Sequence, residues 1–144
     1  MSYSACSNSA LLAPSGYIEG AIGYSFTPVL STGVNVNSGV QASAFTDITL
    51  PKGVWLLSGT LQVDATGGTI AAGYAQVEKN GAAVTQVNFF TPEQYISFCL
   101  SVVVVSDGND TIGLNVEAST SGGAQWELGA GSPTSCLINI TRIA

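Results

Sequence analysis

The sequence predicts an all-β fold, a sandwich or barrel of about eight to ten short antiparallel strands. Apolar and polar residues alternate in many segments, and turn-forming Gly, Pro, Asn and Asp separate those segments. No segment shows the period of an amphipathic helix. The 144 residues suit one domain. We therefore expect a β domain over residues 21–144, preceded by an extended arm over residues 1–20, which are small, polar and interrupted by Pro and Gly.

Alternation places the expected strands in order along the chain. The expected segments are 21–27, a short stretch at 34–36, 40–50, the run from Trp55, 70–78, 82–89, 95–105, 111–118, 125–128 and 136–143. The strand at 95–105 is apolar on both faces near its end, so we expect that end to be buried on both sides. Cys99 and Cys136 lie in apolar strands and are expected as small core residues, with a disulfide between them as the alternative.

The segment DITLPKGVWLL is predicted to be a corner at which a strand begins. Pro51 cannot donate to a strand ladder, and Gly53 permits a tight reversal. Beyond them, alternate residues from Trp55 onward share one apolar face. The residues expected in the core are Trp55, Leu57, Leu61, Val63, Ile112, Leu114, Val116, Ile138 and Ile140.

Two turns stand out in the second half. Lys79-Asn80-Gly81 predicts a hairpin, because Asn-Gly accepts positive φ at both central positions of a type I′ turn. The stretch 107–110, Asp-Gly-Asn-Asp, offers oxygen ligands that calcium prefers, but it does not have EF-hand spacing. We interpret it as a plain β-turn.

Charge is scarce, and this narrows the possible partners. Charged residues make up 8% of the chain, and the net charge is −6. The three basic residues are scattered, so we expect no nucleic-acid partner and no anionic membrane partner. A weakly charged surface favours coverage by other subunits, with a monomer as the alternative. The start of the sequence lacks the pattern of a signal peptide, so synthesis in a cytoplasm is expected.

Catalytic motifs are missing from the sequence. Without histidine, Ser-His-Asp and Cys-His catalysis are excluded, and the three cysteines do not have zinc-site spacing. We expect no enzyme activity, no metal and no cofactor. Trp126, beside Gln125 and Glu127, is the best candidate for an exposed aromatic that binds sugar, although a place in the core or a subunit interface is also open.

Three stretches carry a family resemblance: ITLPKGVWLLSGTLQV (48–63), VVVVSDGNDTIGLNVEAS (102–119) and the terminal CLINITRIA (136–144). In this order they resemble trimeric jelly-roll virion proteins of tailed phages, whose fold is similar to that of tumour necrosis factor. The resemblance covers roughly residues 40–144. It implies an antiparallel β-sandwich of jelly-roll type, a homotrimer, and a binding role without catalysis.

Two functions follow from the resemblance. One is a head decoration (cement) protein on the capsid surface, which binds the major capsid protein. The other is the receptor-binding tip of a tail or head fibre, which needs a shaft. The sequence begins at Met1 without a shaft, so decoration is expected. A carbohydrate-binding jelly-roll module is a third possibility. The expected capsid anchors are the apolar residues of the arm: Tyr3, Leu11, Leu12, Tyr17 and Ile18. The alternative is that the arm is disordered or packs on its own trimer.

Overall fold

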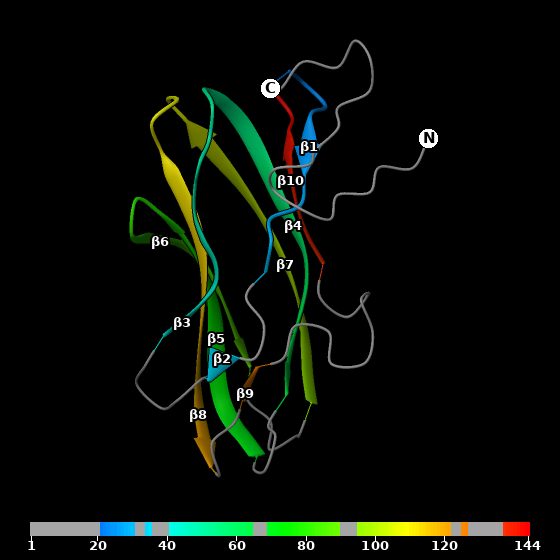
Figure 1. Ribbon diagram of the computed structural model, residues 1–144, viewed down its shortest axis with the longest axis vertical. Helices are drawn as coiled ribbons and strands as arrows, with labels where there is room; N and C mark the ends of the chain where they lie inside the picture. The colour runs from blue at the N-terminus through cyan, green and yellow to red at the C-terminus, as the bar shows by residue number, and fades with distance from the viewer. Residues whose placement is uncertain are drawn as a thin grey trace.

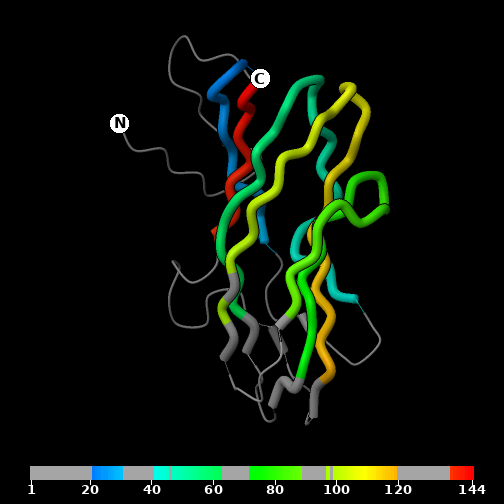
Figure 2. The backbone as a smooth tube through the Cα atoms, turned by 180° about the vertical axis from the view of Figure 1, so that it is seen from behind, coloured from blue at the N-terminus to red at the C-terminus, as the bar shows by residue number. Residues whose placement is uncertain are grey.

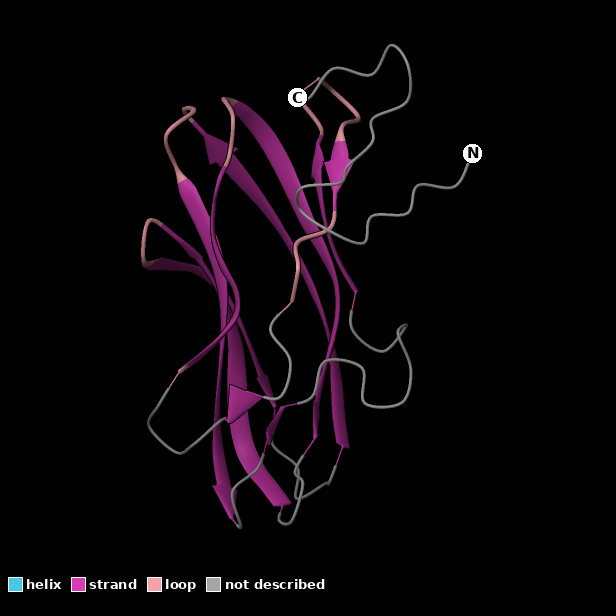
Figure 3. Ribbon diagram, viewed as in Figure 1, coloured by secondary structure: helices cyan, strands magenta, loops and turns pink. Residues whose placement is uncertain are grey.

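The computed structural model describes residues 21–30, 34–35, 41–64, 69–89, 95–121, 125–126 and 137–144. These residues form ten strands, and no helix occurs among them (Figure 3). The strands make two antiparallel sheets that face each other across the core (Figure 1). The all-β sandwich predicted from alternation is therefore confirmed.

The first sheet has the strand order β1-β10-β4-β9-β2, and β7 also pairs with β4. Its strands are β1 (Ser25–Phe26), β2 (Val34–Asn35), β4 (Gly53–Asp64), β7 (Tyr95–Ser106), β9 (Gln125–Trp126) and β10 (Leu137–Arg142). The β4–β7 pair is the longest and stays in register from Gly53 opposite Ser106 to Asp64 opposite Tyr95.

The second sheet has the strand order β3-β8-β5-β6. Its strands are β3 (Ala42–Thr49), β5 (Thr69–Lys79), β6 (Ala82–Phe89) and β8 (Thr111–Ser121). The chain changes sheet between β2 and β3, β3 and β4, β4 and β5, β6 and β7, β7 and β8, and β8 and β9 (Figure 2). Such repeated crossing between two antiparallel sheets is the connectivity of a jelly roll.

The core lies between the sheets and is made by alternate residues of each strand. Val77 of β5 and Phe45 of β3 meet residues of the first sheet there. Trp55 is 1% exposed, and its ring meets the rings of Tyr24 and Phe26 edge to face at centroid distances of 6.5 and 6.2 Å. Of the residues expected in the core, the structure buries Trp55, Leu57, Leu61, Ile112, Leu114, Val116, Ile138 and Ile140. The side chain of Val63 lies outside the described part.

The first expected strand is shorter than predicted. Only Ser25–Phe26 pairs with β10, and Ile22 is 71% exposed. The cause is a turn: the backbone nitrogen of Tyr24 donates to the Ala21 oxygen at 2.9 Å, and Gly23 has a φ of 85°. Glycine adopts that left-handed conformation without steric cost, so the chain reverses where alternation predicted extension.

Strand β7 corrects two further expectations. Cys99 is exposed and free, although it was predicted in the core. Val103 and Val105 are 54% and 62% exposed, although that end of the strand was predicted to be buried on both sides. The even-numbered residues Leu100 and Val104 point into the core, so their odd-numbered neighbours point outward, where no described element covers them. Cys136 lies outside the described residues.

Candidate interaction surface

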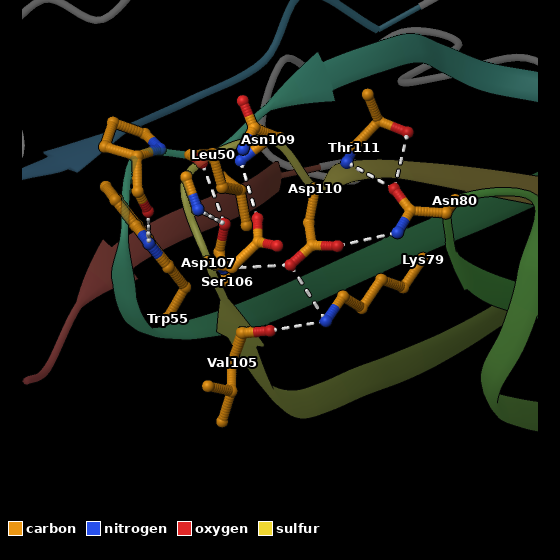
Figure 4. A network of polar contacts seen from close by, with 12 residues as sticks. Leu50, Trp55, Lys79, Asn80, Val105, Ser106, Asp107, Asn109, Asp110 and Thr111 are labelled. Atoms are coloured by element: carbon orange, nitrogen blue, oxygen red, sulfur yellow. Dashed lines mark hydrogen bonds and ion pairs between the residues drawn. The ribbon is translucent and has the colours of Figure 1, made fainter.

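The two predicted turns meet at one carboxylate, that of Asp110 (Figure 4). Asn80 and Gly81 have φ values of 53° and 75°, which confirms the predicted Asn-Gly hairpin between β5 and β6. The Asn80 amide nitrogen donates to Asp110 Oδ1 at 2.6 Å, and Lys79 Nζ lies 2.9 Å from Asp110 Oδ2. The hairpin is thereby tied to the turn that joins β7 and β8.

Asp110 also organises its own turn. Its Oδ2 accepts from the backbone nitrogen of Asp107 at 2.9 Å, and Asp107 Oδ1 accepts from the backbone nitrogen of Asn109 at 2.8 Å. The hydrogen bonds to the Asp110 carboxylate stabilise its charged form. The Asp107 N–H above all, then the Asn80 amide and the Lys79 ammonium, lower the pKa of Asp110 to about 2. The segment 107–110 is a turn, as interpreted from its sequence. The carboxylate of Asp110 is already hydrogen-bonded within the protein.

The corner between β3 and β4, which contains Leu50 and Pro51, joins the same cluster (Figure 4). The backbone nitrogen of Leu50 donates to the Asp110 oxygen at 2.9 Å, and the buried hydroxyl of Ser106 donates to the Leu50 oxygen at 2.8 Å. Three chain reversals thus hold one another at this end of the sandwich. The contacts are internal, so the cluster supports the fold and presents no open site for a ligand.

No group of three or more His, Cys, Asp and Glu side chains that could bind a metal occurs among the described residues. Within the same part of the chain, no helix has the length and hydropathy needed to cross a membrane.

The outward side of β1, β10, β4 and β7 is the candidate interaction surface, and we call it the uncharged face. Between Val54 and Gln62, the outward positions of β4 carry no acid or base, and the same holds for the described outward side chains of its neighbours. The uncharged face consists of Ser25, Thr27, Val54, Leu56, Ser58, Thr60, Gln62, Ser97, Cys99, Ser101, Val103, Val105, Leu137, Asn139, Thr141 and Ile143.

Strand register divides the uncharged face into two parts. Val54 lies opposite Val105, and Leu56 lies opposite Val103, so aliphatic side chains gather where β4 begins and β7 ends. Ile143 adds to them, since its backbone nitrogen donates to the Val54 oxygen at 2.8 Å and its side chain is 45% exposed. Farther along, serine, threonine and cysteine replace the aliphatic side chains on β4 and β7, although Leu137 of β10 is exposed there, opposite Thr60.

Polar side chains of the uncharged face partly satisfy one another. The hydroxyls of Ser25 and Thr141 are 2.9 Å apart, and the Thr27 hydroxyl donates to Asn139 Oδ1 at 2.9 Å. Groups that are already hydrogen-bonded lose less on removal from water than unpaired groups do. The face therefore combines exposed aliphatic area with polar groups that tolerate being covered.

The other candidates from the sequence fall outside the described part. Tyr3, Leu11, Leu12, Tyr17 and Ile18 belong to residues 1–20, which the structure does not describe. The backbone of Trp126 is described: β9 pairs with β2, with Trp126 opposite Val34. Its side chain is not described, so its role as a sugar-binding aromatic stays a prediction.

Sequence reasoning did not single out the uncharged face. The signal for it is the second apolar side of 95–105, which none of the described elements covers. Four consecutive valines, 102–105, resemble a strand buried on both faces, so the pattern alone predicts core there.

The fold and the described surface define a single-chain antiparallel jelly roll with one uncharged, partly aliphatic sheet face. Solved structures with a similar fold are known. The Eiger TNF structure from S. frugiperda superposes with a TM-score of 0.59 at 10% sequence identity, over 85% of this chain and 92% of that one. The fold is therefore a jelly roll like that of tumour necrosis factor, as the resemblance implied.

Weaker likenesses are found to murine APRIL, with a TM-score of 0.48, 12% identity, and coverage of 77% of this chain and 98% of that one. Rabbit GITRL gives a TM-score of 0.44 at 15% identity, over 68% of this chain and 71% of that one. Family models and curated protein sequences give no match.

Proposed function

We propose that this protein is a structural virion protein, a homotrimeric head decoration (cement) protein that binds the major capsid protein on the capsid surface and stabilises the capsid of a tailed phage. It acts by binding and has no enzyme activity. Its synthesis takes place in the host cytoplasm, and three copies associate through the uncharged face.

The observation that supports self-association is the chemistry of the uncharged face. Val103, Val105 and Ile143 gather where β4 begins and are 54%, 62% and 45% exposed, whereas Leu137, 47% exposed, lies farther along the same side, opposite Thr60. A contiguous exposed apolar patch marks an interaction site on a soluble protein. Copies with a net charge of −6 repel one another, and contact through a face without acids or bases brings the fewest like charges close together.

Support for the capsid partner comes from the sequence. The motifs at 48–63, 102–119 and 136–144 resemble phage virion proteins, and the residues 1–20 carry apolar anchors in an otherwise polar stretch. A trimer presents three such arms to a symmetric surface. Three linked contacts bind far more tightly than one, because the second and third occur at high effective concentration.

The test uses the full chain and a variant without residues 1–20, each mixed with purified capsids that lack the protein. Sedimentation of the capsids then measures bound protein. We expect the full chain to co-sediment and the shortened chain to stay in solution, while light scattering shows both to be trimers. Failure of the full chain to bind capsids would contradict decoration, and binding to host cells instead would indicate a fibre tip.

A further inference from the structure

The outward face of the second sheet has the opposite chemistry to the uncharged face. Among the side chains that the structure describes, its strands present amides and carboxylates, including Glu78 and Glu117, around the aromatic ring of Tyr74. On β5, Tyr74 lies opposite Glu117 of β8 and opposite Asn88 of β6. A carboxylate, a phenol and an amide thus form one row across three adjacent strands.

Tyr74 is held in place by two hydrogen bonds. Its hydroxyl donates to Glu117 Oε2 at 2.7 Å and accepts from Gln41 Nε2 at 3.1 Å. The bond to Glu117 raises the pKa of Tyr74, because loss of the phenol proton would break it and place two negative charges side by side. The ring is therefore anchored as a neutral, fixed surface.

A hollow of about 260 Å³ opens beside this ring. In the described part of the neighbouring outward row, Ala72 lies opposite Ser119, and these two small side chains leave space beside the ring. Tyr74, Asn88 and Glu117 also line the hollow. The hollow is smaller than the roughly 300–1,000 Å³ pockets that enclose drug-sized ligands, so it suits a single ring.

Polar atoms around the hollow have hydrogen-bonding capacity to spare. Among the described contacts, Glu117 uses Oε2 and leaves Oε1 as an acceptor. Asn88 accepts from Gln86 Nε2 at 2.6 Å through its oxygen, which leaves its NH₂ group as a donor. The Ser119 hydroxyl can do either. An acceptor, a donor and a hydroxyl beside an aromatic ring match a ligand with several hydroxyls and an apolar C–H face.

The charge around the hollow disfavours an anionic ligand. Glu117 lines the hollow, and none of the described residues that line it is a lysine or arginine. Lys79, five residues along β5 from Tyr74, is engaged with Asp110 and with the Val105 oxygen at 2.7 Å. A carboxylate-bearing sugar would meet like charge without a compensating base, and like charges brought together cost binding energy.

We propose that the hollow beside Tyr74 binds one ring of a neutral saccharide. Sugar hydroxyls donate to Glu117 Oε1 and accept from the Asn88 amide, while the C–H face of the sugar packs on the Tyr74 ring. The site is built within one chain, so it depends neither on association through the uncharged face nor on a capsid.

The test is saturation-transfer-difference NMR on the full chain with glucose, galactose, mannose, rhamnose and N-acetylglucosamine, and with N-acetylneuraminic acid as the anionic comparison. We expect transfer to at least one neutral sugar and none to the anionic one. For the sugar that binds, Glu117→Gln and Tyr74→Ala should each raise the Kd about tenfold or more, because each removes one principal contact.

Glu78→Gln is the matched control, since it removes the same charge from the same sheet face but does not line the hollow. It should leave the Kd within about twofold of the unmodified protein. Circular dichroism of each variant shows that it is folded. Transfer to no neutral sugar would overturn the proposal. Equal loss in Glu78→Gln, unchanged binding in Glu117→Gln and Tyr74→Ala, or equal transfer to N-acetylneuraminic acid would overturn it as well.

Discussion

The indole nitrogen of Trp55 donates a hydrogen bond to the backbone oxygen of Pro51, 2.9 Å away. The donor is the first large core residue of β4. The acceptor belongs to the proline that follows shortly after the end of β3. Proline supplies no N–H to a strand ladder, yet its carbonyl still needs a partner. The tryptophan satisfies this carbonyl and fills the end of the core at the same time, which explains why the two residues stand together in the sequence.

Trp55→Phe separates these two roles. The ring is retained in smaller form, and the Pro51 oxygen loses its donor. We expect the free energy of unfolding to fall by about 1–3 kcal/mol, because the part-buried hydrogen bond is lost and the smaller ring fills less of the core. Urea unfolding measures this as a lower midpoint with an unchanged slope. Unchanged stability would mean that the hydrogen bond contributes nothing to the corner.

Asn80 is predicted to matter through both its backbone and its side chain. It adopts a φ of 53°, and its side chain bonds Asp110 and the Thr111 nitrogen, the latter at 2.8 Å. Asn80→Gly keeps the left-handed backbone and loses only the side-chain bonds. Asn80→Ala loses both, so thermal unfolding should show it as the less stable variant by about 1 kcal/mol or more. Equal stability of the two variants would mean that the positive φ at position 80 costs alanine nothing.

Asp110 predicts a specific dependence of stability on pH. Its pKa is lowered from 3.8 to about 2 in the folded state. The unfolded chain therefore binds the proton first as pH falls, so the carboxylate stabilises the fold above about pH 4 and this contribution is lost as pH drops toward 2. The difference in unfolding free energy between the unmodified protein and Asp110→Asn should be constant above about pH 5 and shrink between pH 4 and 2. A difference that stays constant down to pH 2 would contradict the proposed charge interaction.

Cys99 offers a chemical probe of the uncharged face. It lies opposite Thr60 in the β4–β7 pair, and its free thiol is exposed in the single chain. In a background with Cys6 and Cys136 replaced by serine, a thiol-specific reagent should label Cys99 slowly in the unmodified assembly. Val103→Lys places a charge on the face and should make labelling fast, because it separates the copies. Equal rates in the two proteins would place Cys99 outside the interface.

The sequence was most informative where short-range chemistry decides the structure. Asn80-Gly81 predicted its own hairpin, and the alternation from Trp55 through Leu61 predicted a buried strand face. Local pattern could not show that the hairpin and the turn around Asp110 meet, because 30 residues separate Asn80 from Asp110 and only the pairing of β5 with β8 brings them together.

Periodicity also cannot say what covers a face. The alternation in β7 gives two sides, and both carry valine near the end of the strand. One side meets the second sheet, whereas the other is exposed within a single chain, as Val103 and Cys99 show. In the same way, the hollow beside Tyr74 depends on which residues face each other across three strands, and a single strand does not contain that information.

The most direct test of the account is the mass in solution of the unmodified protein and of Val103→Lys, measured by sedimentation equilibrium. Val103 is 54% exposed, so its replacement should leave the fold of one chain intact, which circular dichroism checks. We expect about 44 kDa for the unmodified protein, three times the 14.6 kDa chain, and a mass close to one chain for Val103→Lys at low micromolar concentration. A mass of one chain for the unmodified protein, or a trimer that Val103→Lys does not weaken, would contradict the assignment of the uncharged face as the self-association surface.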